Sequence, residues 1–406
     1  MRRVVVTGMG IVSSIGSSLS EVLDSLREAK SGISFSPEMA ERGFKSQIHG
    51  KPQLDVTEVL DRKTRRFMGE GAAWNYIAMR DAIEDAGLEK KDISDPMTGI
   101  VMGSGGPSTR TIVEAAQKTI ETGSPRKIGP TSVPSAMSST NSACLAVPYE
   151  IKGLNYSISS ACATSVHCIG HAYEQVAMGK QDVIFAGGGE ELDWTLSNMF
   201  DAMGAMSSKY NDNPSIASRA YDAARDGFVI AGGAATVVVE CLDRALARGA
   251  KIWGEITGYA ANSDGFDMVA PSGEGATRCM KKAMETVKRA IGYINTHGTS
   301  TKVGDIREAN AIRDAFGEKT PPFGSTKSLT GHSLGAVGAQ ELIYSLLMMK
   351  NRFLAKSAHI DELDPEFEGM NILRERIDNV DLGAFMSNSF GFGGTNACLV
   401  MEKYEG

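Results

Sequence analysis

The sequence predicts an α/β protein in which helices cover a mostly parallel sheet. Short runs rich in valine and isoleucine alternate with apolar repeats at helical spacing, a pattern typical of parallel strands joined by helices. Hydrophobic residues make up 42% of the 406 residues and charged residues 22%, which is ordinary for a chain with a buried core. The 45 glycines, about 11% of the chain, exceed the average usage of ~7%. They indicate tight turns and close backbone contacts, and the composition excludes a disordered or fibrous protein.

The chain opens with an expected strand at 4–6 and a helix that begins after Ser18. Ser18 and Glu21 have the spacing of a capping box, in which the serine side chain caps the helix. Apolar side chains at 19, 22, 23 and 26 then share one helical face, and Gly32 is the expected stop. The glycines within 7–13 imitate a dinucleotide fingerprint, but the third glycine is absent and the helix begins too late to hold a pyrophosphate.

Strands and helices continue to alternate through the rest of the chain. In the first half we expect helices at 71–86 (stopping at Gly87) and 163–178, and strands at 100–102, 156–159 and 183–186, the last ending on Gly187. The pattern restarts near Gly249, with strands expected at 252–259, 293–295, 323–325, 384–387 and 397–402, and helices at 276–290, 305–316 and 334–349. The sequence therefore predicts two α/β halves, residues 1–250 and 251–406.

Net charge and cysteine content indicate which binding partners and which cellular compartment to expect. With 42 Lys and Arg against 49 Asp and Glu, the net charge is −7, which argues against nucleic acid or anionic membranes as partners. Six cysteines are too few for a disulfide scaffold and favour a reducing compartment. The first apolar run is shorter than the ~7–15 residues of a signal peptide. The uncharged stretch near a predicted strand, 227–239, is rich in glycine and alanine and shorter than the ~18 residues of a spanning helix. We expect a cytoplasmic protein.

The sharpest candidate for chemistry is Cys162, within the segment 157–165. A predicted strand ends there, small residues make a turn, and the cysteine falls at the expected start of a helix. Free N–H groups and the helix dipole would lower the thiol pKa at such a position and make it a nucleophile. The alternative is a small buried hydrophobic residue, which most free cysteines are. The other cysteines lack this setting: Cys144, Cys168, Cys241, Cys279 and Cys398.

Two histidines follow predicted strands of the second half. His297 and His332 each lie in a loop beyond the carboxyl end of a strand, where open α/β sheets bind ligands. A single loop histidine is more often a solvent-exposed or capping residue. Two such loops together with Cys162 favour a site of one nucleophile and two imidazoles. His167 and His171, on the helix after Cys162, are interpreted as structural.

Weaker motifs occur elsewhere in the chain. The glycine-rich turn 391–396 is either a plain turn between two strands or a source of amides that face an oxyanion. Walker, HExxH and paired CxxC patterns do not occur, so we expect no nucleotide cofactor and no metal. Basic side chains cluster at 62–66 and 126–127; they form either a solvated surface or a docking patch for a small acidic partner.

Four of these segments together resemble the β-ketoacyl-acyl carrier protein synthases of the thiolase-like superfamily. They are 160–165 around Cys162, 295–300 around His297, 327–336 with Lys327 and His332, and 388–396 with the glycine-rich turn. The Cys-His-His set is similar to synthases I and II, and the segments 155–165 and 200–206 are more similar to type I. The resemblance covers essentially the whole chain.

The resemblance implies a thiolase-like fold: five layers, α-β-α-β-α, built from two similar βαβαβαββ halves, usually in a homodimer. It also implies the reaction. Acyl carrier protein delivers an acyl group to Cys162, malonyl-carrier protein loses carbon dioxide, and the resulting carbanion attacks the acyl thioester. The product is a 3-ketoacyl chain two carbons longer. Substrates travel on the carrier's phosphopantetheine, and no further cofactor is implied.

The family's functional residues carry over to matching positions. His297 and His332 would donate to the enolate oxygen, each worth about 3 kcal/mol as an oxyanion donor. Lys327, with Glu308 as its charged partner, would organise the site. The amides of Cys162 and Phe392 would hold the second oxyanion, and the Phe392 ring would gate the acyl pocket. Thr299 and Thr301 match positions that bind the pantetheine arm, and Phe200 and Phe390 are assigned to substrate binding. The residues that match the carrier-protein docking surface are Arg62, Lys63, Arg66, Arg126 and Lys127.

Two residues differ from the type I pattern, and two other protein classes are alternatives to a condensing enzyme. Pro107 and Met199 differ from the type I pattern in segments expected near the acyl tunnel or dimer interface. Chain-length preference therefore stays open, and a type II synthase is the alternative to type I. A coenzyme A thiolase would need a second catalytic cysteine near the C-terminus, and Cys398 is a poor fit on its predicted strand. An inert chain-length-factor subunit would lack the nucleophile, which is present here.

Overall fold

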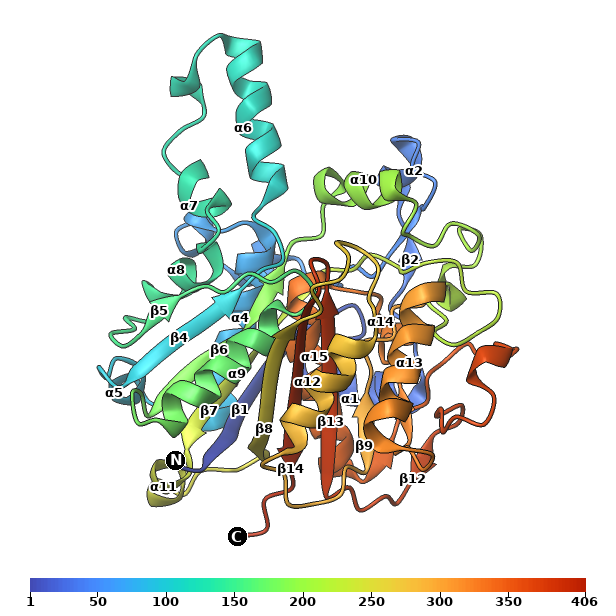
Figure 1. The fold of residues 1–406 in the computed structure, drawn as a ribbon. Coiled ribbons are helices and arrows are strands. Elements are labelled where there is room, and N and C mark those ends of the chain that lie inside the picture. Colours follow the sequence, from blue (N-terminus) through green and yellow to red (C-terminus); the bar gives the residue numbers. More distant parts are fainter.

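Ten strands form one mixed sheet in the computed structural model, which describes all 406 residues. Their order is β10-β9-β13-β14-β8-β1-β7-β6-β4-β5, and Figure 1 shows the strands from β9 to β5 side by side across the molecule. The first half supplies β1 (Val4–Val12), β4 (Thr98–Gly103), β5 (Asn155–Tyr156), β6 (Val183–Glu190) and β7 (Gly233–Cys241). The second half supplies β8 (Gly254–Ser263), β9 (Tyr293–Asn295), β10 (Phe323–Gly324), β13 (Ala384–Gly391) and β14 (Thr395–Glu402).

Each half repeats the same strand arrangement. In the first half, β1 pairs with β7, which pairs with β6, then β4 and β5; in the second, β8, β14, β13, β9 and β10 follow the same order. A short antiparallel pairing of β1 with β8 joins the two sets. Four of the nine strand pairs are parallel and five antiparallel, so the expectation of a mostly parallel sheet is wrong. Strand–helix alternation cannot reveal that the last strand of each half reverses, as β14 does after a tight turn.

Helices make three layers around these two sets of strands. α9 (Thr164–Ala177) and α15 (Val337–Asn351) pack against each other and against strands of both halves, so they form the middle layer. α15 is apolar all round and buried from Val337 to Met349, as a helix inside a core should be. α4 (Glu70–Ala86) covers the outer face of the first set; α12 (Glu274–Met284), with α13 (Lys302–Phe316), covers the second. This is the five-layered thiolase-like fold that the family resemblance implies.

Helix ends test the capping predictions. α1 (Leu19–Glu28) begins as expected, because the Ser18 hydroxyl accepts from the backbone N–H of Glu21 at 3.3 Å. The Glu21 carboxylate accepts from Ser17 rather than from Ser18, so the capping box is displaced by one residue. The helix ends at Ala29, which adopts a left-handed φ of 51°, before Gly32 is reached. α4 ends on Gly87 with a φ of 63°, as predicted.

Two strands are longer than predicted because glycines lie inside them. β1 continues through Gly10, where a Cβ atom would lie 1.9 Å from the carbonyl oxygen of Ala78 in α4. The fingerprint-like glycines of 7–13 therefore allow a helix to pack closely on a strand. β6 likewise continues through Gly187, whose Cβ would lie 2.1 Å from the carbonyl oxygen of Ala235 in β7. β5, by contrast, covers only Asn155–Tyr156 instead of 156–159.

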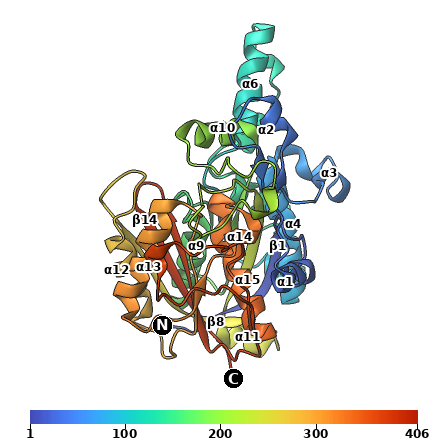
Figure 2. The same cartoon turned by 90° about the vertical axis from the view of Figure 1, so that its right-hand side faces the viewer.

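The remaining elements lie around this core. α6 (Thr109–Thr122) has no buried residue and projects from the body in both views (Figures 1 and 2). No helix combines the length and the apolar character required to span a bilayer. The smaller elements are α2 (Pro37–Glu41), α3 (Val56–Val59), α5 (Lys90–Ile93), α7 (Ser132–Ala136), α8 (Thr140–Ala146), α10 (Trp194–Met203), α11 (Leu242–Ala247), α14 (Lys327–Thr330), β2 (Ser34–Phe35), β3 (Ile48–His49), β11 (Phe353–Leu354) and β12 (Ile377–Asp378).

Candidate active site

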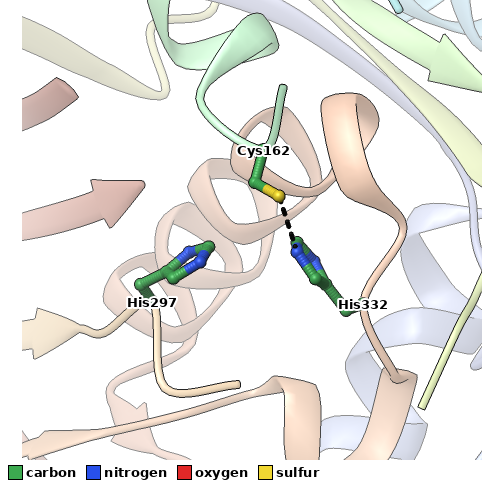
Figure 3. Close-up of side chains that lie close together, drawn as sticks. All are labelled: Cys162, His297 and His332. Carbon is green, nitrogen blue, oxygen red and sulfur yellow. Dashed lines mark hydrogen bonds between the residues drawn. The ribbon is translucent and has the colours of Figure 1, made fainter. Parts of the chain in front are cut away.

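Three segments far apart in the sequence bring Cys162, His297 and His332 together (Figure 3). Cys162 lies in the turn before α9, His297 follows β9, and His332 follows α14. The His332 Nε2 atom lies 3.0 Å from Cys162 Sγ, and the two imidazole rings are 5.3 Å apart and nearly perpendicular, at 87°. Cys162 Sγ and one ring nitrogen of each histidine lie within 4.8 Å of one another. The predicted cluster of one thiol and two imidazoles therefore exists.

The turn that carries Cys162 is held by side chains of α9. Ala161 adopts a left-handed φ of 48°, which is unusual for a residue other than glycine and typical of functional sites. The Ser160 backbone N–H donates to Thr164 Oγ1 at 2.8 Å, and the Ser160 hydroxyl lies 2.7 Å from His167 Nδ1. His167 is thus structural, as predicted. α9 begins only at Thr164, so Cys162 precedes the helix rather than starting it.

Burial decides the protonation of the cluster. It raises the pKa of the Cys162 thiol to about 12, and the nearby positive charge of Lys327 lowers the pKa only in part. The prediction that the helix start lowers this pKa is therefore wrong, because desolvation outweighs the dipole. Burial also lowers the pKa of both His297 and His332 well below the ordinary value. At neutral pH the site holds a thiol and two neutral imidazoles, and His332 Nε2 can accept the S–H proton.

Lys327 and Glu308 support the cluster, but not as a pair. The Lys327 ammonium forms its ion pair with Glu341 on α15, at 2.5 Å, and both side chains are buried. The Glu308 carboxylate instead accepts the backbone N–H groups of His297 and Gly298, each at 2.8 Å. The expectation that Glu308 is the charged partner of Lys327 is therefore wrong. Spacing along the chain does not show which of two buried carboxylates a lysine reaches.

A cavity of about 320 Å³ opens onto the cluster. Its lining includes every predicted catalytic and substrate-binding residue except Lys327, namely Cys162, His297, His332, Glu308, Thr299, Thr301, Phe200, Phe390 and Phe392. The hydroxyls of Thr299 and Thr301 lie 3.0 Å apart. The Phe392 side chain is 39% exposed and lies 6.4 Å from the Phe200 ring, at the wall of the cavity.

Sequence reasoning missed two residues of this site. Phe228 also lines the cavity, with its ring 5.6 Å from that of His332 and 5.5 Å from that of Phe200. No local pattern distinguishes it from any other buried phenylalanine. Glu341, by contrast, could have been found from the sequence, because it is the only charged residue between Val337 and Met349. A lone charge inside a buried helix needs a partner, which here is Lys327.

The remaining candidates lie outside the cavity. Cys398 is buried in β14 within a core cluster of the second half, so it does not supply the second thiol of a thiolase. The basic residues are exposed and form no ion pair within the chain; they are Arg62, Lys63, Arg66, Arg126 and Lys127.

Several known proteins are similar to this chain in sequence over its full length. The "3-oxoacyl-[acyl-carrier-protein] synthase 1" of Haemophilus influenzae is 58% identical over 406 residues, covering all of both chains. The protein of the same name from Escherichia coli K12 is 57% identical over 404 residues, 99% of each chain. A "3-oxoacyl-[acyl-carrier-protein] synthase 2" from Coxiella burnetii is 37% identical over 411 aligned residues, again 99% of each.

Solved structures and family models agree with these relatives. A beta-ketoacyl synthase from Burkholderia phymatum superposes with a TM-score of 0.94 at 36% identity, covering both chains completely. A type II polyketide synthase structure, a ketosynthase in complex with its acyl-carrier protein, has a TM-score of 0.90 at 29% identity and also covers both chains. The model of the beta-ketoacyl synthase N-terminal domain matches residues 1–245, and that of the C-terminal domain matches 253–361. The chain therefore belongs to the beta-ketoacyl synthase family.

Proposed function

We propose that this chain is a 3-oxoacyl-[acyl-carrier-protein] synthase of type I, a condensing enzyme of fatty acid biosynthesis. It lengthens an acyl group held on Cys162 by two carbons taken from malonyl-carrier protein. The observation that carries the proposal is the 3.0 Å contact between the half-buried Cys162 thiol and a neutral imidazole, with a second neutral imidazole facing the same cavity. The relatives named synthase 1, at 57–58% identity, favour type I over type II, whose named relative is 37% identical.

The first half-reaction moves the acyl group to the enzyme. His332 Nε2 takes the thiol proton as Cys162 Sγ attacks the acyl thioester, so no free thiolate has to form in the poorly solvated site. Negative charge then develops on the former carbonyl oxygen. The backbone N–H groups of Cys162 and Phe392 make no backbone hydrogen bond in the protein and are free to donate to this oxygen. When the tetrahedral intermediate collapses, the C–S bond to pantetheine breaks, and the proton returns to the leaving thiol.

The second half-reaction forms the carbon–carbon bond. Malonyl thioester loses carbon dioxide, and the electron pair of the broken bond moves onto the thioester oxygen as an enolate. His297 donates an N–H to that oxygen, and so does His332, whose neutral ring carries its proton on Nε2 once the acylated Cys162 no longer donates to that atom. The enolate carbon attacks the acyl-Cys162 carbonyl, the C–S bond to Cys162 breaks, and the leaving sulfur takes a proton supplied by solvent through His332, which restores the thiol. Lys327 is a poor base because it is ion-paired with Glu341. Burial is the main cause of the lowered pKa of both imidazoles, and the positive charge of Lys327 lowers it further.

Other cavity residues suit the two arms of the substrate. Thr299 and Thr301 present hydroxyls that can hydrogen-bond the amides of a pantetheine arm. The phenylalanines at 200, 390 and 392 line the cavity near the thiol and provide an apolar surface for an acyl chain. We infer that Phe392 gates that surface, and its greater exposure than the other two supports this role. We infer no cofactor beyond the carrier's phosphopantetheine.

Condensation measured across acyl-carrier proteins of increasing chain length tests the proposed function and its subtype. We expect a 3-ketoacyl product from malonyl-carrier protein with every medium-length acyl donor, including the cis-unsaturated ten-carbon chain accepted by type I enzymes. Product from all donors except the unsaturated one would instead assign type II. Activity with acetyl-coenzyme A and none with malonyl-carrier protein would reject the condensing function and support a thiolase.

Charge reversal in the basic patch tests carrier docking. Single Arg66→Glu and Lys127→Glu variants are expected to raise KM for acyl-carrier protein about 3- to 10-fold, with kcat within about 2-fold of the parent, because the patch acts on association. Steady-state kinetics at low salt measure this, and Lys180→Glu, an exposed cation beyond the far end of α9, is the control. An equal loss with a free acyl-pantetheine substrate would contradict docking.

We further propose that the chain works as a homodimer in the cytoplasm. Apolar side chains on and beside the α6 arm are largely exposed, among them Ile120 at 82%, Val133 at 76% and Val147 at 78%. β5 also ends the sheet with an unpaired edge that a second copy can cover. Sedimentation equilibrium should give about twice the 43.2 kDa of the chain, and a monomer mass would reject the dimer.

The cytoplasmic location is a separate proposal. All six cysteines are free, which suits a reducing compartment. Recovery of the protein in a membrane or secreted fraction would contradict a cytoplasmic location.

A further inference from the structure

Glu190, the last residue of β6, is a buried carboxylate without an ion-pair partner. Its side chain is 1% exposed. It accepts four hydrogen bonds instead: from the Ser104 hydroxyl at 2.8 Å and from the backbone N–H groups of Gly105 at 2.6 Å, Gly106 at 3.3 Å and Gly335 at 2.8 Å. A buried charge is unfavourable unless such donors compensate for lost water. Four donors directed at one carboxylate indicate that its place in the fold matters.

These donors come from segments that border the catalytic cluster. Gly335 lies three residues after His332, in the turn that leads into α15, and a Cβ atom there would lie 2.2 Å from the backbone nitrogen of Gly105. The loop that contains Ser104 also accepts, through the Ser104 carbonyl, a hydrogen bond from the Ser159 hydroxyl at 2.9 Å. Ser159 begins the turn that carries Cys162. Glu190 therefore connects the His332 segment of the second half with the Cys162 turn of the first.

We propose that Glu190 is a positioning residue that holds the His332 segment against the Cys162 turn. The proposal rests on the proposed function, because it assigns the residue that keeps the thiol and its base in contact. Its charge has a second consequence. Among the charged groups near the thiol, Lys327 lowers the pKa of Cys162, whereas Glu190 and Glu341 raise it. Burial is the largest cause of the raised pKa of this thiol, and a negative charge on Glu190 adds to it.

A Glu190→Gln variant separates positioning from general stability. Burial raises the pKa of Glu190 to about 7, so at pH 8 the parent carboxyl is mostly ionised. At that pH we expect acyl transfer from acyl-carrier protein to Cys162 to slow by about 10- to 100-fold, since a small displacement of reacting groups has such effects. Alkylation of Cys162 by iodoacetamide should rise about 3-fold, because a like charge beside the thiolate is removed. Mass spectrometry of the Cys162 peptide measures both rates.

The matched control is Glu191→Gln. The Glu191 carboxylate accepts from the Ser108 hydroxyl and the Glu70 backbone near the base of α6, away from the cluster, and neither rate should change. Unchanged acyl transfer in Glu190→Gln overturns the proposal, and so does a parallel fall of both rates, which a loosened fold would give. If that variant does not fold, Ser104→Ala, which removes one donor, must slow transfer about 3-fold or the proposal fails. A parent enzyme that loads acyl groups without condensing them would refute the proposed function alone.

Discussion

Replacing Cys162 by alanine is expected to abolish covalent acyl loading and to reduce condensation by at least about 10⁴-fold. Loading requires a sulfur that attacks the incoming thioester and later leaves, and no other thiol lines the cavity. Intact-protein mass spectrometry after incubation with acyl-carrier protein measures the first loss, and release of 3-ketoacyl product measures the second. The size of the effect follows from removing the nucleophile itself rather than a group that assists it.

Cys168→Ala is the matched control for this variant. Cys168 lies six residues further along on α9, and burial raises the pKa of its thiol to about 12 as well. It packs in the main hydrophobic core outside the cavity, so alanine there should lower stability slightly and leave loading intact. Acyl mass found on a Cys162→Ala enzyme would show that another nucleophile accepts the chain. That result would remove the basis of the proposed first half-reaction.

Burial explains why the site works with neutral groups. A thiolate–imidazolium pair would place two charges where desolvation already opposes each of them, as the raised pKa of Cys162 and the lowered pKa of both histidines indicate. A neutral thiol hydrogen-bonded to a neutral imidazole avoids that penalty in the resting enzyme. Charge then develops only as substrate fills the cavity, beside amides and N–H groups fixed in advance.

Local chemistry in the sequence predicts local structure well. The strand Tyr293–Asn295 has the predicted bounds, Ser18 caps its helix, and Gly87 ends α4. The three residues of the cluster were also identified from loops after strands and from a cysteine near a helix start. In each case the deciding interactions lie within a few residues along the chain. Periodicity and capping are properties of such short segments.

Properties that depend on distant segments could not be predicted. Strand direction, and hence the mixed sheet, depends on which edge of the sheet a returning strand occupies. The thiol pKa depends on desolvation by several layers around Cys162, which exceeds the helix-dipole effect of about 1 kcal/mol. The partner of Lys327 and the four donors to Glu190 are set by tertiary contacts between residues up to 145 positions apart. Only the lone charge of Glu341 left a trace in the sequence.

Removing either imidazole should separate the two half-reactions. His297→Ala and His332→Ala are each expected to lower decarboxylation of malonyl-carrier protein about 10²- to 10³-fold, the usual effect of losing one oxyanion donor. Both variants should still acquire acyl mass on Cys162. His332→Ala should load more slowly than His297→Ala, because only His332 contacts the sulfur, at 3.0 Å. Carbon dioxide release and acyl mass, measured on the same preparation, follow the two steps independently.

Asparagine at 297 refines this test, because its side-chain amide restores an N–H donor without an imidazole. If hydrogen bonding to the enolate is the role of His297, His297→Asn should recover part of the decarboxylation that alanine loses. His359→Ala, at a half-buried histidine bound to the Ser218 carbonyl at 3.1 Å, should leave both steps unchanged. Loss of loading with normal decarboxylation in the two alanine variants would reverse the assignment. The imidazoles would then serve the thiol rather than the enolate, and the stabilisation of the enolate oxygen would have to come from the backbone amides.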